Sequence, residues 1–205
     1  MTLITDAVRE ELSTLYSGPS RFYHNLSHVD TLLKLLNQHR SHFTDPDAIE
    51  AAIWFHDAVY DSRAKGDANE VASADLAVAH LREGQDTSSI DADRLEKIRV
   101  MIVATATHTV PSFVPENTAA EADAALFLDM DLSILGAGED VFAAYEAAVR
   151  KEYSWVDDDG WREGRSDVLA RFLAREYIYH SVLFRRLYEA PARRNLEESL
   201  RRLAA

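Results

Sequence analysis

Two short stretches of the chain carry histidines and an aspartate at spacings that can bind a metal ion. His24 and His28 lie four residues apart in RFYHNLSH, a spacing that places both on one face of a helix. His56 and Asp57 are adjacent in AAIWFHDAVYD, where most neighbours are apolar. Because an isolated buried carboxylate is costly, Asp57 should pair with another group, take up a proton or bind a metal. For each stretch alone, a packing or surface role is the alternative.

A third stretch, residues 126–136, holds Asp129 and Asp131 between apolar neighbours in LFLDMDLSILG. Capping of the short helix that follows is the alternative role for one of these carboxylates. Taken with the histidines, they form a mixed nitrogen and oxygen set that suits a divalent metal ion, namely Mn, Fe, Zn, Mg or Co. The chain has no cysteine, so thiolate zinc sites, disulfides and cysteine nucleophiles are excluded.

Other polar residues are candidates for contacts with a substrate or with water near the metal. His108 ends the stretch ATATH, where it could serve a second metal, contact a substrate or be a polar helix end. Asp61, Asn69 and Glu70 follow the His-Asp pair, and they either orient a ligand or lie on the surface. We expect surface or packing roles for the remaining histidines, which are His39, His42, His80 and His180.

Helices must position these residues, because the apolar pattern is helical almost throughout the chain. Thr44 or Asp45 is expected to cap a long helix with Pro46 at its first position, and Gly84 is expected to end the next one. The pattern predicts helices over 44–60, 67–81, 88–108, 119–135 and 139–156, with further helices to the end. We therefore predict an all-α fold, a single globular domain over residues 1–205 with roughly eight to ten helices.

Charge and hydropathy limit the partners of the protein. The net charge of −13 argues against a nucleic-acid backbone as the main partner, although residues 162–205 hold 10 arginines against 6 acids. No apolar run is long enough to cross a membrane, and the N-terminal residues turn acidic at Asp6, unlike a signal peptide. We expect a cytoplasmic protein whose partner is a small phosphorylated substrate, and a homo-oligomer is compatible with the sequence.

The chain resembles the HD superfamily of metal-dependent phosphohydrolases, and more closely its bacterial group of predicted metal-dependent phosphohydrolases. The resemblance covers nearly the whole chain and rests on YHNLSH, WFHDAVYD, NEVASA, ATATH, DMDLSILG and the tail GRSDVLARFLAREYIY…ARRNLEESL. It implies an HD-domain helical bundle in which His28, His56, Asp57 and Asp131 bind the metal. Asp131 is preferred to Asp129 because MDLS resembles the ADLS and ADRL segments that supply the last ligand in related enzymes.

The opening motif YHN..H also resembles that of cyclic-nucleotide phosphodiesterases, and this likeness implies that His24 is a general acid. We therefore expect hydrolysis of phosphate esters by metal-activated water, with His24 and Asp57 as catalytic residues. Arg21, His108 and Arg165 are the expected substrate contacts, and Arg193 is a further arginine that could stabilise phosphoryl charge. The alternatives are a non-catalytic, metal-containing module that binds a nucleotide or a protein, and a di-iron oxygenase.

Overall fold

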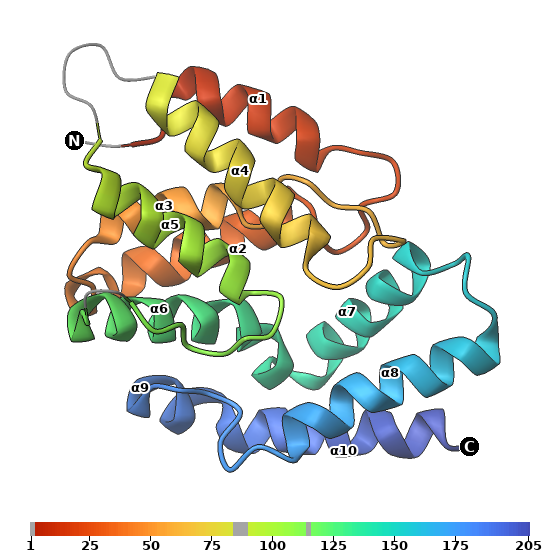
Figure 1. The fold of residues 1–205 in the computed structure, drawn as a ribbon. Coiled ribbons are helices and arrows are strands. Elements are labelled where there is room, and N and C mark those ends of the chain that lie inside the picture. The colour runs from red at the N-terminus through yellow and green to blue at the C-terminus, as the bar shows by residue number, and fades with distance from the viewer. Residues whose placement is uncertain (1–2, 84–89, 114–115) are drawn as a thin grey trace. The chain divides into compact units, whose positions relative to one another are not determined.

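The computed structural model describes residues 3–83, 90–113 and 116–205, and within them the protein is all-α, with helices and no strand. This confirms the predicted fold class (Figure 1). Gly84, the expected end of one helix, lies outside the described residues. No helix in the described part of the chain is long and apolar enough to cross a membrane.

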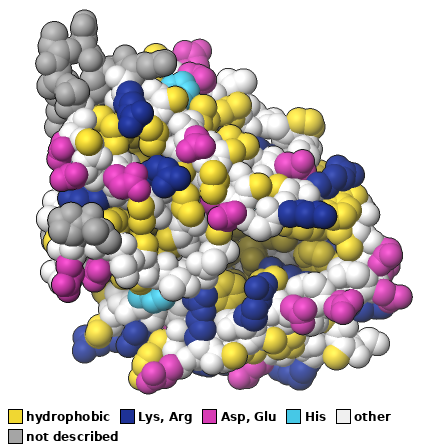
Figure 2. Space-filling view, in the orientation of Figure 1, with side chains coloured by type: hydrophobic (Ala, Val, Ile, Leu, Met, Phe, Trp, Pro, Cys, Tyr) yellow, Lys and Arg dark blue, Asp and Glu magenta, His cyan; other side chains and the backbone are white. Residues whose placement is uncertain are grey.

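Contacts along the chain divide it into two compact units, residues 1–128 and residues 129–205, which we describe separately. The single-domain organisation expected from the sequence stays a prediction. On the face drawn in Figure 2, acidic and basic side chains are interspersed among apolar ones.

The first unit is built around α3, a mostly apolar helix. Residues Ala51, Ala52, Ile53 and Phe55 of this helix are completely buried, as a central helix requires. The helices α1, α2, α4 and α5 all pack against α3. The helices of this unit are α1 Asp6–Tyr16, α2 Leu26–Gln38, α3 Pro46–Phe55, α4 Ala68–Glu83 and α5 Ala92–Ala104, with a short 3-10 helix, η1, at Arg40–His42. The helix α6 Thr118–Asp131 begins in this unit, and its last residues, from Asp129 on, belong to the second.

Capping interactions fix the start of α3. Asp45 is the N-cap residue and accepts a hydrogen bond from the backbone N–H of Ala48, while Pro46 occupies the first turn, as predicted. The buried carboxylate of Asp123 accepts hydrogen bonds from the backbone N–H groups of Thr44 and Asp45. These bonds satisfy donors that the first turn of a helix leaves unpaired.

The end of α3 differs from the prediction, which extended this helix to residue 60. The helix ends at Phe55, His56 is its C-cap residue, and Asp57 lies in the turn that follows. The physical reason is tertiary hydrogen bonding: the carbonyl groups of Asp57 and Ala58 accept from Arg21. The His-Asp pair is therefore presented from a helix end, where the backbone is free to turn both side chains toward one point.

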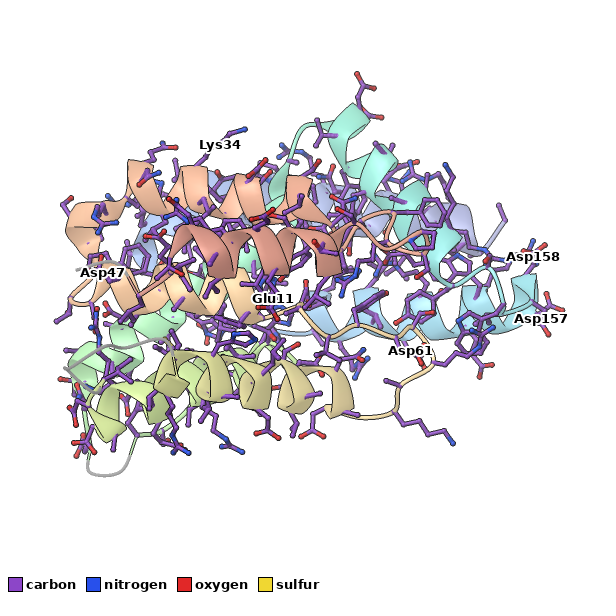
Figure 3. The ribbon with its side chains drawn as sticks, turned by 90° about the horizontal axis from the view of Figure 1, so that it is seen from above. Glu11, Lys34, Asp47, Asp61, Asp157 and Asp158 are labelled. Carbon is purple, nitrogen blue, oxygen red and sulfur yellow. The ribbon has the colours of Figure 1, made fainter. Side chains whose placement is uncertain are left out.

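The second unit contains η2 Leu132–Gly136, α7 Glu139–Glu152, α8 Asp158–Leu173, α9 Val182–Phe184, the π-helical η3 Arg185–Glu189 and α10 Ala190–Leu203. The helix α10 packs against α8, η2 and η3. Asp157 caps α8 by accepting a hydrogen bond from the backbone N–H of Gly160, and its side chain is labelled in Figure 3. The predicted helices over 67–81, 119–135 and 139–156 are present as α4, α6 with η2, and α7.

Candidate metal centre

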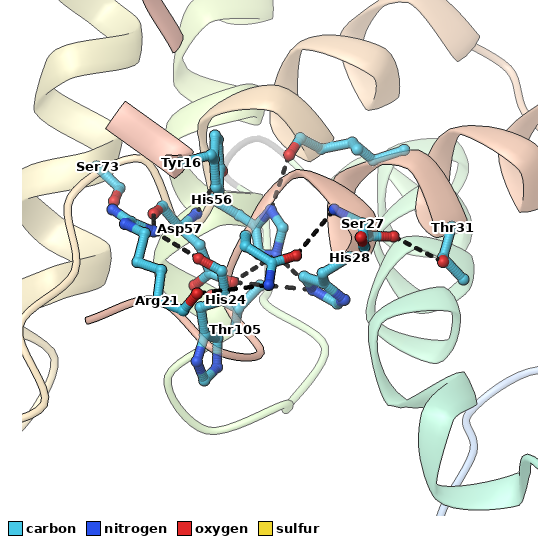
Figure 4. A network of polar contacts seen from close by, with 12 residues as sticks. Tyr16, Arg21, His24, Ser27, His28, Thr31, His56, Asp57, Ser73 and Thr105 are labelled. Carbon is cyan, nitrogen blue, oxygen red and sulfur yellow. Dashed lines mark hydrogen bonds and ion pairs between the residues drawn. The ribbon is translucent and has the colours of Figure 1, made fainter. Parts of the chain in front are cut away.

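Three side chains of the first unit direct ligand atoms to one point. His28 lies in the first turn of α2, His56 is the C-cap of α3, and Asp57 follows it (Figure 4). The Nε2 atoms of His28 and His56 are 3.1 Å apart, and Asp57 Oδ2 lies 3.0 Å from His56 Nε2. The distance from His28 Nε2 to Asp57 Oδ2 is 3.8 Å. This group could hold a metal ion.

The spacing of these three atoms fits the ligand shell of a small divalent cation. For metal–ligand distances of about 2.1 Å, neighbouring ligand atoms lie about 3.0 Å apart in an octahedral shell and about 3.4 Å apart in a tetrahedral one. Two of the three observed separations match these values and the third is slightly longer. The donor set of two imidazole nitrogens and one carboxylate oxygen suits zinc, manganese, iron or cobalt.

A hydrogen bond at the far side of the His56 ring supports the same role. Its Nδ1 atom lies 2.8 Å from the carbonyl oxygen of Ile53, one turn earlier in α3. Because a carbonyl can only accept, we assign a ring proton to Nδ1, so Nε2 is the ring nitrogen that a metal ion would use. Metal-binding histidines commonly donate their second ring N–H to a backbone carbonyl in this way.

Neighbouring histidines keep the carboxyl group of Asp57 ionised against the effect of burial, so that it can act as a ligand. Burial alone would raise the pKa of the Asp57 carboxyl. The charges of three neighbouring histidines, His56 foremost, and a hydrogen bond from His56 act in the opposite direction and hold that pKa well below its ordinary value. The two ligand histidines are 7% and 1% exposed, and the Asp57 side chain is 16% exposed, so the group lies at the edge of the core.

Arg21 fastens the two chain segments that carry these ligands. Its guanidinium donates to the carbonyl oxygens of His24, Asp57 and Ala58 at 2.9, 2.7 and 2.8 Å. The same group lies over the ring of Tyr16, 5.0 Å from its centre. Arg21 was expected to bind a substrate. In the structure its guanidinium donates hydrogen bonds to three backbone carbonyls. The substrate role stays a prediction.

Tyr16 was not expected to take part in the site, because an apolar helix face in the sequence explains a buried tyrosine equally well. Its hydroxyl donates to the carbonyl of Trp54 and accepts from the backbone N–H of Asp57. This hydroxyl therefore helps to define where the chain leaves α3. No local sequence signal identifies it, since its partners lie about forty residues away.

His24 lies beside the ligand group and is held by aromatic rings. Its imidazole stacks on Tyr60 with ring centres 4.4 Å apart and meets Tyr23 edge to face at 5.0 Å. Its ring centre is 6.4 Å from that of His28, and its charge contributes to the lowered pKa of Asp57. The two histidines of RFYHNLSH thus occupy different positions, one within the ligand group and one next to it.

Burial raises the pKa of Glu70, the third residue of α4. The charges of Asp57 and His108 both affect the pKa of Glu70. His108 follows the end of α5 with a positive φ of 49°, a left-handed conformation that is uncommon for residues other than glycine. The side-chain amide of Asn69 bonds to the backbone of Asp61: its Oδ1 accepts from the Asp61 N–H and its Nδ2 donates to the Asp61 carbonyl, both at 3.0 Å. Figure 3 labels Asp61 in the loop after α3.

The second unit resolves the roles of the two aspartates in LFLDMDLSILG in part. Asp129 is fully buried and accepts hydrogen bonds of 2.7 Å from the backbone N–H groups of His180 and Ser181, next to the start of α9. It is therefore a structural residue. Asp131 ends α6 and makes no capping bond to η2 through its side chain. Its role as a metal ligand stays a prediction.

Arg165 is buried within the second unit and has partners there. Its guanidinium bonds to Glu146 and to the hydroxyl of Tyr145. Burial would lower the pKa of Arg165, but these two neighbours raise it, so the charge is retained. These contacts give Arg165 a structural role in joining α7 to α8, and its expected contact with a substrate stays a prediction.

Comparisons with protein-family models, with curated proteins and with solved structures find no match for this chain.

Proposed function

We propose that this protein is a metal-dependent hydrolase of phosphate esters, acting on a nucleotide or another small phosphorylated metabolite. The observation that carries the proposal is the convergence of His28 Nε2, His56 Nε2 and Asp57 Oδ2 on one point at the edge of the core. Two imidazole nitrogens and a carboxylate oxygen can each give a lone pair to a divalent cation at this point.

The order of these residues supports the same proposal. A histidine, then a His-Asp pair, then a later aspartate is the arrangement that the resemblance to the HD superfamily implies. Within this proposal Asp131 supplies a further carboxylate, while Asp129 is occupied by two backbone N–H groups.

The chain's own residues account for the remaining parts of the chemistry. A divalent ion in this site would lower the pKa of a water molecule and polarise a phosphoryl oxygen. His24, beside the ligand group and held by the Tyr60 ring, would protonate the departing ester oxygen. Arg21 would keep His24 and Asp57 at a constant separation through its bonds to both backbone segments.

Metal analysis followed by activity assays tests this proposal. The purified protein is expected to hold a divalent metal and to hydrolyse p-nitrophenyl phosphate or bis-p-nitrophenyl phosphate. His56→Ala and Asp57→Asn should each lose metal and activity together, because each removes a ligand atom. Hydrolysis that survives either substitution would exclude this site as its source.

The main alternative is a metal-containing module that binds a nucleotide or a protein without turnover. Metal-dependent melting with no hydrolysis of any phosphoester in a broad screen would favour that reading. Asp131→Asn tests the fourth ligand: it should weaken metal binding, whereas Asp129→Asn should leave metal binding intact and reduce stability.

A further inference from the structure

The imidazole of His24 is held on two sides by tyrosine rings. It lies against the face of Tyr60, with the ring centres 4.4 Å apart and an angle of 27° between the ring planes. The ring of Tyr23 meets the same imidazole nearly at a right angle, at 82°, with the ring centres 5.0 Å apart. Both arrangements are ones that aromatic pairs prefer, so the two contacts together restrict the rotation of the histidine ring.

The segment that carries Tyr60 is fastened near the candidate ligand pair. Val59 is bound at both its backbone N–H and its carbonyl by the hydroxyl of the buried Ser73, at 3.0 and 3.2 Å. The guanidinium of Arg21 lies 5.5 Å from the centre of the Tyr60 ring while it donates to the carbonyl of Asp57 at 2.7 Å (Figure 4 labels Arg21 and Asp57). Tyr60 therefore holds the imidazole from the same segment that carries Asp57.

Tyr23 connects the held imidazole to the ligand group from the other side. Its ring centre is 4.9 Å from that of His28, and the ring centres of His24 and His28 are 6.4 Å apart. His24 is nevertheless not one of the three residues whose ligand atoms lie within 4.8 Å of one another. A fixed ring beside the ligand atoms, but outside their group, suits a residue that acts on a bound substrate.

We infer that Tyr60 is a positioning residue, whose ring holds His24 where that imidazole gives a proton to the departing ester oxygen. The inference rests on the proposed hydrolysis and specifies the substrates that need the stacked pair, namely phosphate esters of alkyl alcohols. In that step the water oxygen bonds to phosphorus and releases a proton to solvent. The bond from phosphorus to the ester oxygen breaks, and this oxygen keeps the electron pair and takes the proton from His24.

The identity of the leaving group makes this role measurable. An alkoxide leaves poorly without a proton, whereas p-nitrophenolate is a stable anion that can leave without one. Loss of a correctly placed acid should therefore slow the hydrolysis of an alkyl ester much more than that of an aryl ester. A loss of stability or of metal would slow both to the same extent.

The test compares Tyr60→Leu, which removes the ring, with Tyr60→Phe, which keeps it. Tyr153→Leu is the matched control, since Tyr153 is also a partly buried tyrosine with aromatic contacts, to Trp155 and Trp161 in the second unit. The kcat and KM are measured for p-nitrophenyl phosphate and glycerol phosphate or, if the protein cleaves only diesters, for bis-p-nitrophenyl phosphate and cyclic AMP. Manganese bound per chain and the melting temperature are measured on the same samples.

For Tyr60→Leu we expect a kcat about tenfold lower with the alkyl ester and within about threefold with the aryl ester, at KM values within about threefold. Manganese binding should be unchanged, and the melting temperature should fall by no more than about 4 °C. Tyr60→Phe should restore the kcat for the alkyl ester to within about threefold of the unmodified protein. Tyr153→Leu should leave the ratio of the two kcat values unchanged.

Proton NMR reports the stacked pair without any turnover. The Tyr60 ring shields the protons of the imidazole that lies on its face, and the resonances of His24 are identified by their absence in His24→Gln. They should move downfield in Tyr60→Leu and much less in Tyr60→Phe.

Three results would each overturn the inference: equal loss of kcat for both esters, loss of manganese binding, or unmoved His24 resonances in Tyr60→Leu. An equal loss for the two esters together with weaker manganese binding would show that Tyr60 acts on the ligand segment through Arg21 instead. If the unmodified protein hydrolyses no phosphoester, the proposed function fails and the inference fails with it. An active protein whose Tyr60→Leu variant treats both esters alike refutes the inference alone.

Discussion

Replacing Arg21 by methionine tests how the candidate site is held together. Methionine keeps much of the aliphatic stem but removes every donor, so the carbonyls of His24, Asp57 and Ala58 lose bonds of 2.7–2.9 Å. A hydrogen bond from a charged group contributes about 1.5–3 kcal/mol. Because Arg21 is only partly buried, water can replace some of these bonds, and we expect a total loss of about 3 kcal/mol.

The assay is thermal and urea unfolding together with metal titration. A loss of about 3 kcal/mol lowers the melting temperature by about 8 °C in a protein of this size. Metal affinity should fall by about tenfold or more, since residues that orient ligands affect affinity on this scale. Arg82→Met is the matched control, because Arg82 is exposed on α4, and we expect a change within about 0.5 kcal/mol.

One result would refute this reasoning directly. If Arg21→Met melts within about 1 °C of the unmodified protein, a difference well under about 1 kcal/mol, and binds metal equally well, the guanidinium does not hold the site. A higher KM for a phosphoester with unchanged stability would instead give Arg21 the substrate contact that the sequence suggested. The two roles are thus distinguished by which quantity changes.

Three further substitutions test other parts of the fold. Asp129→Ala removes both acceptors next to the start of α9 and should lower the free energy of urea unfolding by about 3 kcal/mol, a loss below about 1 kcal/mol being contrary to a capping role. Burial raises the pKa of the Asp45 carboxyl, but hydrogen bonds from Arg94 outweigh this effect and leave the pKa below its ordinary value. The ionised carboxylate therefore stabilises the fold above its unfolded pKa of about 3.9. This contribution is lost as the pH falls through the lower pKa of the folded state. Arg94→Met should therefore reduce the melting temperature at pH 7 and have progressively less effect toward pH 3; an equal effect at both would exclude this coupling. Gly136→Ala places a Cβ 2.7 Å from Tyr188 Cβ and should cost about 1–3 kcal/mol, whereas unchanged unfolding in urea would show that this contact relaxes freely.

Much of the helical framework follows from local sequence signals. The apolar run from Ala51 to Phe55 predicts a buried helix, and Asp45 followed by Pro46 predicts its start. These signals are reliable because periodicity and capping involve residues within one or two turns of each other. The absence of cysteine limited the possible metal ligands to nitrogen and oxygen donors, while the choice of His28, His56 and Asp57 came from the family resemblance.

Partners distant in sequence limited the prediction at other places. The helix end at Phe55 depends on Arg21 and Tyr16, whose hydrogen bonds reach segments about forty residues away. Periodicity could not locate this end, because Ala58 and Val59 continue the apolar pattern. The structural role of Asp129 likewise depends on backbone N–H groups some fifty residues later in the chain.

The amino-acid sequence by itself determined the helical class, the start of α3 and the chemical types of the candidate ligands, because these depend on residue identity and on neighbours within a few positions. Only the tertiary structure decided which carboxylates serve the fold and which face the candidate site. Asp123 and Asp129 are bound to backbone N–H groups, while Asp57 meets two imidazoles. The sequence could not separate these cases, because a structural carboxylate and a ligand carboxylate can both have apolar neighbours in the sequence. Only folding determines which hydrogen-bond donors approach each one.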